Sequence, residues 1–318
     1  MTEKSIMASE PRERDQTIGF VGLGYMGHGL AKNIREAGYP LRFLANRRRE
    51  AAEDMIRRGA VEVGSPLELS ESCDVVCLCL PGSPQVEEVV AGENGLLAHA
   101  RPGLVILDSS TSQPVSTRRL AELAKVRGAT FIDAPLSRTP KEAWAGTVDC
   151  MVGAEAADLE ALRPLIETFA GRILHTGPTG SGHTMKLLNN FLSLGYGALY
   201  AEALAIGAKS GVSAETFHQV IGGGRMDCPF YQTFMQYVVG GDENAHLFTL
   251  RNAHKDTRYL VDLANAHGIA THVSSAVKNS YAQAEGMGRG DSFVPMLTDI
   301  VAELNGVSRT PPASAGGR

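Results

Sequence analysis

The sequence of 318 residues has no apolar run long enough to cross a bilayer and no signal-peptide pattern at its beginning. It also has no long basic stripe, and its formal net charge is −5. These absences remove the usual sequence reasons to expect a membrane protein, a secreted protein, or one that binds nucleic acid or anionic lipid. We therefore expect a cytoplasmic protein whose partner is a small molecule.

Cysteine is scarce, and its five copies form no metal-binding pattern. Cys73, Cys77 and Cys79 lie on or beside one apolar run, whereas Cys150 and Cys228 stand alone. Because buried cysteine usually behaves as a small apolar residue, we expect five reduced thiols and no metal site.

Two different patterns of apolar residues follow one another along the chain. In the first half, short apolar runs alternate with amphipathic stretches, which predicts a helix at 25–37 and strands at 17–22, 41–44, 75–80, 104–107 and 130–132. Nearly continuous apolar strands that alternate with helices are typical of a parallel sheet covered on both faces. Beyond about residue 177 proline nearly disappears, and Ala- and Leu-rich helical stretches follow, beginning with 185–209.

These patterns predict two domains. Residues 16–180 are expected to form an α/β, doubly wound Rossmann domain, and residues 181–306 an all-helical domain, with the active site in the cleft between them. Residues 1–15 and 307–318 are polar or rich in Pro, Gly and Ser, so we expect flexible tails there.

A Gly-x-Gly-x-x-Gly motif directly follows the first predicted strand and opens the first predicted helix. In that context Gly22 permits a tight turn, Gly24 lets the backbone approach a pyrophosphate, and Gly27 allows close helix packing. The N-terminus of the helix would face the phosphate charge. The motif predicts a dinucleotide site. We assign four further residues to the same site: Leu23 and Met26 within the motif, and Leu80 and Pro81 at the end of the apolar run 75–80.

Cofactor preference depends on the end of the second strand, where a carboxylate would bind the ribose 2′-hydroxyl of NAD and repel a 2′-phosphate. The chain reads Asn46-Arg47-Arg48-Arg49 there, without a carboxylate. Arg47 and Arg48 offer planar, permanently charged groups for a phosphate, so the sequence favours NADPH over NADH and places Asn46 in the site. The alternative is a solvated basic turn before a helix.

Five motifs occur in an order and at spacings that match one enzyme family. They are Gly22–Gly27, Asp108–Thr111, Asp133–Ser137, Gly180–Asn190 and His254–Asp256. Through them the chain resembles, over roughly residues 17–304, the β-hydroxyacid dehydrogenases, which include 3-hydroxyisobutyrate dehydrogenases, tartronate semialdehyde reductases and sulfolactaldehyde reductases. The resemblance implies NAD(P)-dependent chemistry on a short aldehyde acid or hydroxy acid, and a homodimer or homotetramer.

The fourth motif carries the predicted chemistry. A reductase needs a group that gives a proton to the carbonyl oxygen as hydride reaches the carbon, and a lysine desolvated in a cleft can serve. Lys186 matches the catalytic lysine of the family. On a helix Asn190 lies one turn beyond Lys186 on the same face, and Asn189 borders that face. Both asparagines match asparagines of the family's site, and the alternative is a surface lysine beside capping asparagines.

Two further motifs supply ligand contacts by resemblance. Asp108–Thr111 follows an apolar strand, so its hydroxyls should emerge at the carboxyl edge of the sheet, where ligands bind. The resemblance assigns Ser110 to the substrate carboxylate, Thr111 to the nicotinamide end of the cofactor, and Lys255 to the cofactor. Lys255 could instead be an ordinary lysine on a helix surface.

The loop Ser137-Arg138-Thr139 departs from most members of the family, which have Ser-Gly-Gly there and surround a substrate carboxylate with backbone amides. We place Ser137 and Arg138 at the substrate. An arginine in this loop adds a full positive charge suited to a sulfonate, a phosphate or a second carboxylate.

Sulfolactaldehyde reductases have a related Gly-Arg-Thr version of this loop. They also have an Asn-Asn-x-x-Ser run, matched here by Asn189, Asn190 and Ser193. That subgroup prefers NAD and usually has an acidic residue at the end of the second strand. This chain has Asn46 and Arg47 there instead, so the preference of the subgroup for NAD does not carry over to it.

Other candidates have plainer interpretations. His28, His183 and His254 flank motifs, and we interpret them as surface histidines near the site. Gly222–Arg225 has the composition of a phosphate loop, but no strand precedes it, so it predicts a turn between helices.

The sequence thus predicts an NADPH-dependent oxidoreductase that reduces a short anionic aldehyde acid, with Lys186 protonating the new alkoxide. Alternatives within the enzymes are an NAD-dependent 3-hydroxyisobutyrate-type dehydrogenase, a sulfolactaldehyde reductase and an imine reductase. Outside the enzymes the alternative is a non-catalytic cofactor-sensing protein. The joint presence of Lys186, Asn190, Ser110 and Thr111 argues against that last alternative.

Overall fold

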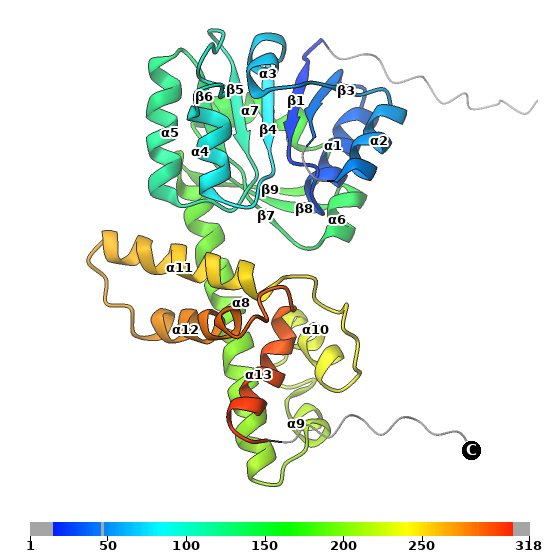
Figure 1. The fold of residues 1–318 in the computed structure, drawn as a ribbon, viewed down its shortest axis with the longest axis vertical. Helices are drawn as coiled ribbons and strands as arrows, with labels where there is room; N and C mark the ends of the chain where they lie inside the picture. Colours follow the sequence, from blue (N-terminus) through cyan, green and yellow to red (C-terminus); the bar gives the residue numbers. More distant parts are fainter. Residues whose placement is uncertain (1–14, 46–47, 308–318) are drawn as a thin grey trace, which may run out of the picture. The chain divides into compact units, whose positions relative to one another are not determined.

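A computed structural model describes residues 15–45 and 48–307 (Figure 1). Residues 1–14 and 308–318, which make up nearly all of the two expected tails, lie outside the described residues, as do Asn46 and Arg47 of the predicted cofactor site. The chain divides into two compact units between Lys186 and Leu187, inside one long helix.

The first unit contains a nine-stranded sheet in the order β3-β2-β1-β4-β5-β6-β8-β7, with β9 paired to β8. Strands β1 to β6 are parallel. The apolar sequences predicted all of these strands except the short β3. Strand β8 runs antiparallel to β6 and β7, which the apolar pattern did not predict. The strands are β1 (Ile18–Val21), β2 (Leu41–Leu44), β3 (Val61–Glu62), β4 (Val75–Leu78), β5 (Val105–Asp108), β6 (Thr130–Asp133), β7 (Leu136–Ser137), β8 (Val148–Gly153) and β9 (Ala170–Gly177).

Helices cover both faces of this sheet. Successive residues of a strand point to opposite faces, so Val75 and Cys77 of β4 pack with α1, α2 and α7, while Val76 and Leu78 pack with α3, α4 and α5. This is the doubly wound α/β fold expected from the sequence. The helices are α1 (Gly27–Glu36), α2 (Arg49–Arg57), α3 (Pro66–Ser72), α4 (Ser83–Ala91), α5 (Pro114–Val126), α6 (Pro140–Ala145) and α7 (Ala156–Ile166).

All five cysteines are free thiols. Cys73, Cys77 and Cys150 are buried in the two cores of the first unit, and burial raises the pKa of each of these thiols. Cys228 lies in the second unit and is partly exposed.

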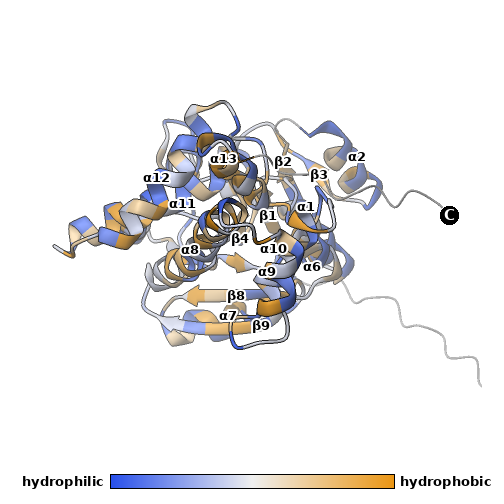
Figure 2. Cartoon of the chain, turned by 90° about the horizontal axis from the view of Figure 1, so that it is seen from below, coloured by the Kyte–Doolittle hydropathy of each residue, from blue (hydrophilic) through white to orange (hydrophobic). Residues whose placement is uncertain are grey.

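The second unit is helical, as predicted, and helix α8 (Ser181–Lys209) leads into it from the first unit. Its other helices are α9 (Ala214–Ile221), α10 (Pro229–Val238), α11 (Leu250–Ala266), α12 (His272–Gly286), the short 3-10 helix Val294–Met296 and α13 (Leu297–Leu304). Helix α11 alternates hydrophobic and hydrophilic residues along its length (Figure 2), which is typical of an amphipathic helix. Gly222–Arg225 lies between α9 and α10, so the predicted helix-to-helix turn is confirmed.

Helix α8 corrects one expectation about hydrophobic runs. By length and composition alone it could cross a membrane, because its mean hydropathy reaches 1.3 over an 18-residue window. In the sequence, the charged residues Lys186 and Glu202 bound the uncharged stretch, so it looks shorter than the helix that contains it. Leu194, Ala198 and Ala201 of this helix lie in the hydrophobic core of the second unit. A helix in the core of a soluble protein can be equally long and apolar, so length and composition alone are weak evidence for a membrane span.

Candidate functional site

The turn after β1 needs glycine at two of its three motif positions. Gly22 has a φ of +103°, and a Cβ there would lie 2.3 Å from the carbonyl oxygen of Cys79. At Gly27 a Cβ would lie 1.9 Å from the carbonyl oxygen of Gly22. At Gly24, in contrast, a Cβ would meet no atom of residues 15–45 and 48–307 within 4 Å. The space beside Gly24 is therefore open to a ligand that approaches the backbone, which fits a pyrophosphate.

Helix α1 begins directly at this turn. Its N-cap residue, Met26, makes no side-chain capping bond, and the first turn contains no acidic residue. The positive end of the helix dipole therefore lacks a carboxylate of its own, which again fits an anionic ligand. Leu23 and Met26 pack against the hydrophobic core, and this packing stabilises the turn.

Arg48 lies beside the same turn. Its guanidinium carbon is 4.6 Å from the centroid of the Tyr25 ring, a cation–π contact between the residue that precedes α2 and the middle of the glycine motif. Tyr25 is 75% exposed. The sequence prediction missed Tyr25, although its position between Gly24 and Gly27 was a usable signal. Arg49 points elsewhere and donates to both carboxylate oxygens of Glu62, at 2.7 and 2.9 Å.

Ser110 joins the ends of β4 and β5. Its hydroxyl accepts a hydrogen bond from the backbone N–H of Leu80 at 2.9 Å, and its own N–H donates to Asp108 at 2.9 Å. Ser110 is buried, Thr111 beside it is half-buried, and Pro81 after Leu80 is exposed. The predicted substrate and cofactor residues of these two loops are thus brought together at the carboxyl edge of the sheet.

The prediction that His183 lies at the surface is wrong, because its side chain is completely buried. Its Nδ1 is 2.7 Å from the hydroxyl of Thr117, and its Nε2 is 3.1 Å from the carbonyl oxygen of Ser110. Carboxylate oxygens of Asp108 and Asp133 lie 3.8 Å from Nε2 and Nδ1 respectively. A histidine with four polar neighbours is stable inside a protein, and the sequence pattern alone did not reveal these neighbours.

Asp133 fixes the beginning of helix α8. Its two carboxylate oxygens accept the backbone N–H groups of Gly180 at 2.6 Å and His183 at 2.7 Å. Burial raises the pKa of this carboxyl, while the neighbouring His183 and these N–H groups act in the opposite direction. The other two histidines pair with carboxylates near the surface: His28 with Asp54 at 2.9 Å, and His254 with Glu285 at 2.7 Å.

Lys186 follows one helical turn after His183 and is partly buried. Asn189 is exposed, and Ser193 donates from its hydroxyl to the backbone carbonyl of Asn190 at 3.2 Å. The structure therefore keeps Lys186 and Asn190 one turn apart on α8, as the sequence predicted, whereas Ser193 is engaged with the helix itself.

Asp256 holds two predicted site residues of the second unit. The side-chain amide of Asn190 donates to Asp256 Oδ2 at 2.7 Å, and the Lys255 ammonium lies 3.2 Å from Asp256 Oδ1. Asn190 and Asp256 are buried. The sequence prediction did not include Asp256 in the site, although it ends the motif that begins at His254.

Arg138 has a left-handed backbone with a φ of +82°, the one positive φ among non-glycine residues in the described part of the chain. Its guanidinium lies 3.1 Å from Asp149, and its side chain is half exposed. Thr139 begins a capping box with Glu142 at the start of α6, which fixes the following turn. The Arg138 charge is therefore paired within the protein, and Ser137 precedes it in β7.

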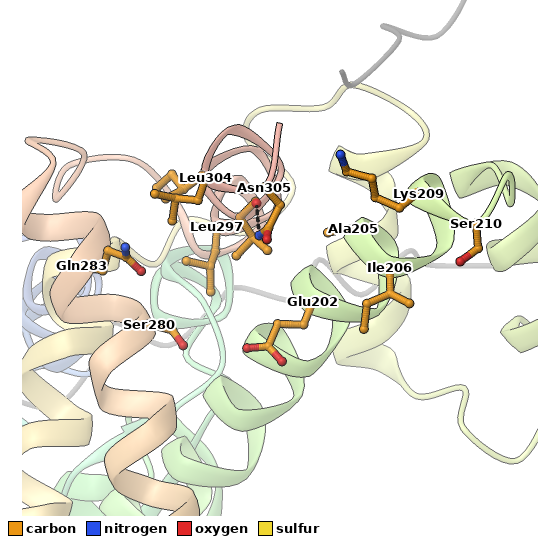
Figure 3. Close-up of a pocket in the computed structure, with 12 residues that line it drawn as sticks. Glu202, Ala205, Ile206, Lys209, Ser210, Ser280, Gln283, Leu297, Leu304 and Asn305 are labelled. Carbon is orange, nitrogen blue, oxygen red and sulfur yellow. Dashed lines mark hydrogen bonds between the residues drawn. The ribbon is translucent and has the colours of Figure 1, made fainter. Parts of the chain in front are cut away.

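Two cavities lie away from all these residues. One, of about 410 Å³, lies at the amino ends of β4, β5 and β6, where Val75, Val105 and Thr130 line it. The other, of about 500 Å³, is a groove in the second unit between side chains of α8, α12 and α13 (Figure 3). Among the predicted site residues that the structure describes, none lines either cavity.

Comparisons with known proteins cover nearly the whole chain. The family described as "NAD binding domain of 6-phosphogluconate dehydrogenase" matches residues 17–177. The family described as "NAD-binding of NADP-dependent 3-hydroxyisobutyrate dehydrogenase" matches residues 180–297.

Individual relatives agree with these family matches. A 3-hydroxyisobutyrate dehydrogenase of Pseudomonas aeruginosa is 31% identical over 285 residues, which cover 87% of this chain and 95% of that protein. A 3-sulfolactaldehyde reductase of Escherichia coli is 28% identical over 274 residues, covering 86% and 91%. A solved structure of a Mycobacterium tuberculosis 3-hydroxyisobutyrate dehydrogenase with L-serine is 28% identical and has a TM-score of 0.80, covering 90% of this chain and 99% of that one.

Proposed function

This chain belongs to the β-hydroxyacid dehydrogenase family and is an NAD(P)-dependent oxidoreductase, and we propose that it uses NADPH to interconvert a short anionic aldehyde acid and its hydroxy acid. The observation that carries the proposal is the position of Lys186, on the helix that Asp133 and His183 join to the carboxyl edge of the sheet. In this proposal residues 16–180 form the cofactor domain and residues 181–306 the helical domain.

The glycine turn and Arg48 would hold the cofactor. The backbone of residues 22–27 and the N-terminus of α1 would bind the pyrophosphate, because that end of the helix is positive and Gly24 leaves room. Arg48, kept beside the turn by Tyr25, would pair with a 2′-phosphate, and Arg47 and Asn46 belong to the same proposal. Lys255 and Thr111 complete the assigned cofactor residues, and the bound nicotinamide supplies the hydride during reduction.

Lys186 would act as the acid of the reaction. As the carbonyl carbon of the aldehyde receives hydride, its oxygen becomes negative, and the Lys186 ammonium donates one proton to form the hydroxyl group. In the direction of oxidation the neutral Lys186 amine takes that proton back. Asn190 would orient the substrate, since Asp256 fixes its amide. Ser110, Ser137, Asn189 and Ser193 are proposed substrate contacts.

Arg138 would select substrates with a second strongly anionic group. Its ion pair with Asp149 is half exposed, and such pairs are held weakly in water. A sulfonate or carboxylate could therefore replace Asp149 as its partner. The alternatives are an NAD-dependent 3-hydroxyisobutyrate-type dehydrogenase and a sulfolactaldehyde reductase, and, outside the enzymes, a non-catalytic cofactor-sensing protein.

The deciding experiment is the consumption of NADPH and of NADH with a panel of aldehydes of similar size. The panel contains a neutral aldehyde, an aldehyde with one carboxylate, one with two carboxylates, and one with a sulfonate. We expect turnover with NADPH and the more anionic members. Tight binding of NADPH without turnover of any member would favour the cofactor-sensing alternative.

We also propose that the protein is a cytoplasmic homo-oligomer assembled through helix α8. Leu192, Leu199 and Ile206 are spaced by seven residues on this helix and are 59%, 62% and 67% exposed. The groove beside them contains Glu202 and Lys209 at the same spacing (Figure 3). A second copy of α8 in antiparallel orientation would cover the apolar side chains and pair these opposite charges.

The oligomer is tested by sedimentation of the full chain. We expect Leu199→Glu to dissociate the oligomer, since it buries a charge in the interface. Val126, at the end of α5, is 82% exposed, and Val126→Glu is the matched control that should leave the assembly intact. Sedimentation of the unaltered protein as a monomer at micromolar concentration would contradict the proposal.

A further inference from the structure

His183 occupies a position between two parts of the candidate site. It lies on the first turn of α8, one turn before Lys186, and its ring reaches the loop that follows β5. Building on the function proposed above, we propose that His183 is a positioning residue: its ring fixes the turn that carries Lys186 relative to the loop that carries Ser110 and Thr111.

The hydrogen bonds define which nitrogen performs this role. The Ser110 carbonyl oxygen can only accept a hydrogen bond, so His183 Nε2, at 3.1 Å, must donate to it. On the other side of the ring, Nδ1 is 2.7 Å from Thr117 Oγ1, whose hydroxyl also lies 3.1 Å from the carbonyl oxygen of Gln113. The Nε2 bond thus reaches the site loop, while the Nδ1 bond reaches helix α5.

The backbone hydrogen bonds to Asp133 alone would still allow the first turn of α8 to rotate. Asp133 holds the N-H groups of Gly180 and His183 and so fixes where α8 begins. Both N–H groups bind one carboxylate, so Asp133 holds the first turn from one side only. The imidazole projects sideways from the helix to Ser110, so it resists the rotation that would swing Lys186 away from the loop.

The packing around the ring leaves little room for compensation. A Cβ on Gly182 would lie 2.5 Å from the carbonyl oxygen of Met151, so the helix already approaches the sheet as closely as glycine permits. The carboxylates that face the ring, Asp108 from β5 and Asp133 from β6, are themselves held by backbone N–H groups. A side chain that replaces the imidazole therefore meets fixed partners at fixed positions.

Two amide substitutions separate the two sides of the ring. The amide of His183→Gln reaches the position of Nε2 and can donate to the Ser110 carbonyl oxygen. The amide of His183→Asn reaches only the position of Nδ1 and restores the Thr117 contact alone. Thr117→Val is the matched control, because it removes the Nδ1 partner and leaves the Ser110 bond in place.

If His183 positions Lys186, kcat follows the Ser110 bond and not the stability of the protein. We expect His183→Asn to lose about a hundredfold in kcat, the scale of a displacement of about 1 Å in an active site, with the KM for NADPH nearly unchanged. His183→Gln and Thr117→Val should keep kcat within about threefold of the unaltered enzyme, even where their melting temperatures fall.

Each other result overturns the inference. A folded His183→Asn with kcat near that of the unaltered enzyme removes the positioning role, and so does an equal loss in kcat for Thr117→Val. A His183→Asn protein that does not fold, beside a folded His183→Gln, assigns the ring to folding alone. Failure of the proposed function is distinct from all of these, since the unaltered protein would then turn over no member of the aldehyde panel.

Discussion

Gly27 and Gly24 of the turn after β1 should fail in two different ways when each is replaced by alanine. In Gly27→Ala the new methyl group would lie 1.9 Å from the carbonyl oxygen of Gly22 and 3.1 Å from Cys79 Cβ. The close oxygen belongs to the backbone of the turn itself, so the turn has to open. In Gly24→Ala the methyl group meets no atom of the described part of the chain within 4 Å, and the backbone needs no positive φ.

These distances translate into different stabilities. Overpacking of a rigid site costs about 1–3 kcal/mol, and each kcal/mol shifts the melting temperature of a protein of this size by about 2–4 °C. We expect Gly27→Ala to melt about 6–12 °C lower at the upper end of that cost. Gly24→Ala should melt at or slightly above the original temperature, because alanine restricts the unfolded chain by about 0.4–1 kcal/mol.

The response to the cofactor gives a second test of Gly24→Ala. A ligand at a hundred times its Kd stabilises the folded state by about 2.7 kcal/mol. If the methyl group of Gly24→Ala occupies the space meant for pyrophosphate and weakens binding a hundredfold, the same concentration contributes only about 0.4 kcal/mol. Gly24→Ala should therefore lose most of the increase in melting temperature that NADPH gives the unaltered protein.

The assay is thermal unfolding of the three proteins with and without NADPH, at one salt concentration. The reasoning would be refuted if Gly24→Ala without cofactor melted as low as Gly27→Ala. It would equally be refuted if Gly24→Ala kept the full stabilisation by NADPH, because the open space beside Gly24 would then have no part in binding.

Three further predictions concern charged side chains. Lys186→Ala should bind NADPH nearly as before while turnover falls at least about a hundredfold, and near-normal turnover would remove Lys186 from the mechanism. Neutral residues in place of Arg47 and Arg48 should weaken NADPH in fluorescence titrations and spare NADH, and the preference of the unaltered protein for NADPH should shrink as salt increases; tighter NADH binding by the unaltered protein would overturn this. Arg138→Gly should lower kcat/KM for a sulfonated or doubly acidic aldehyde about thirty- to a hundredfold more than for a neutral one. Equal losses would mean that Arg138 only supports its loop.

The elements with a local signature were predictable from the sequence. The glycine turn and the parallel strands β1, β2, β4, β5 and β6 follow from residue spacing and from continuous apolar runs. The exposed, two-residue β3 has no such signature and was not predicted. The direction of β8 was not predictable, because continuous apolar strands indicate a sheet covered on both faces but do not exclude one antiparallel strand within it.

The start of α8 shows a second limit of prediction from the sequence alone. We predicted a helix from residue 185, where the Ala- and Leu-rich stretch begins, and the glycines at 180 and 182 disfavour a helix before it. The helix begins at Ser181 because Asp133, far away in sequence, accepts the N–H groups of Gly180 and His183. The burial of His183 has the same origin, because its polar neighbours come from β5, β6 and α5.

The buried thiols make the opening of the first unit measurable. A buried thiol with a raised pKa reacts only when its surroundings open, and Cys73, Cys77 and Cys150 all lie inside the first unit. Cys228 of the second unit is partly exposed, so it can react without such an opening and serves as the reference. Labelling followed site by site in a mass spectrometer therefore times the opening of the first unit against an accessible thiol. Equal rates at all four cysteines would mean that burial gives the three thiols of the first unit no protection.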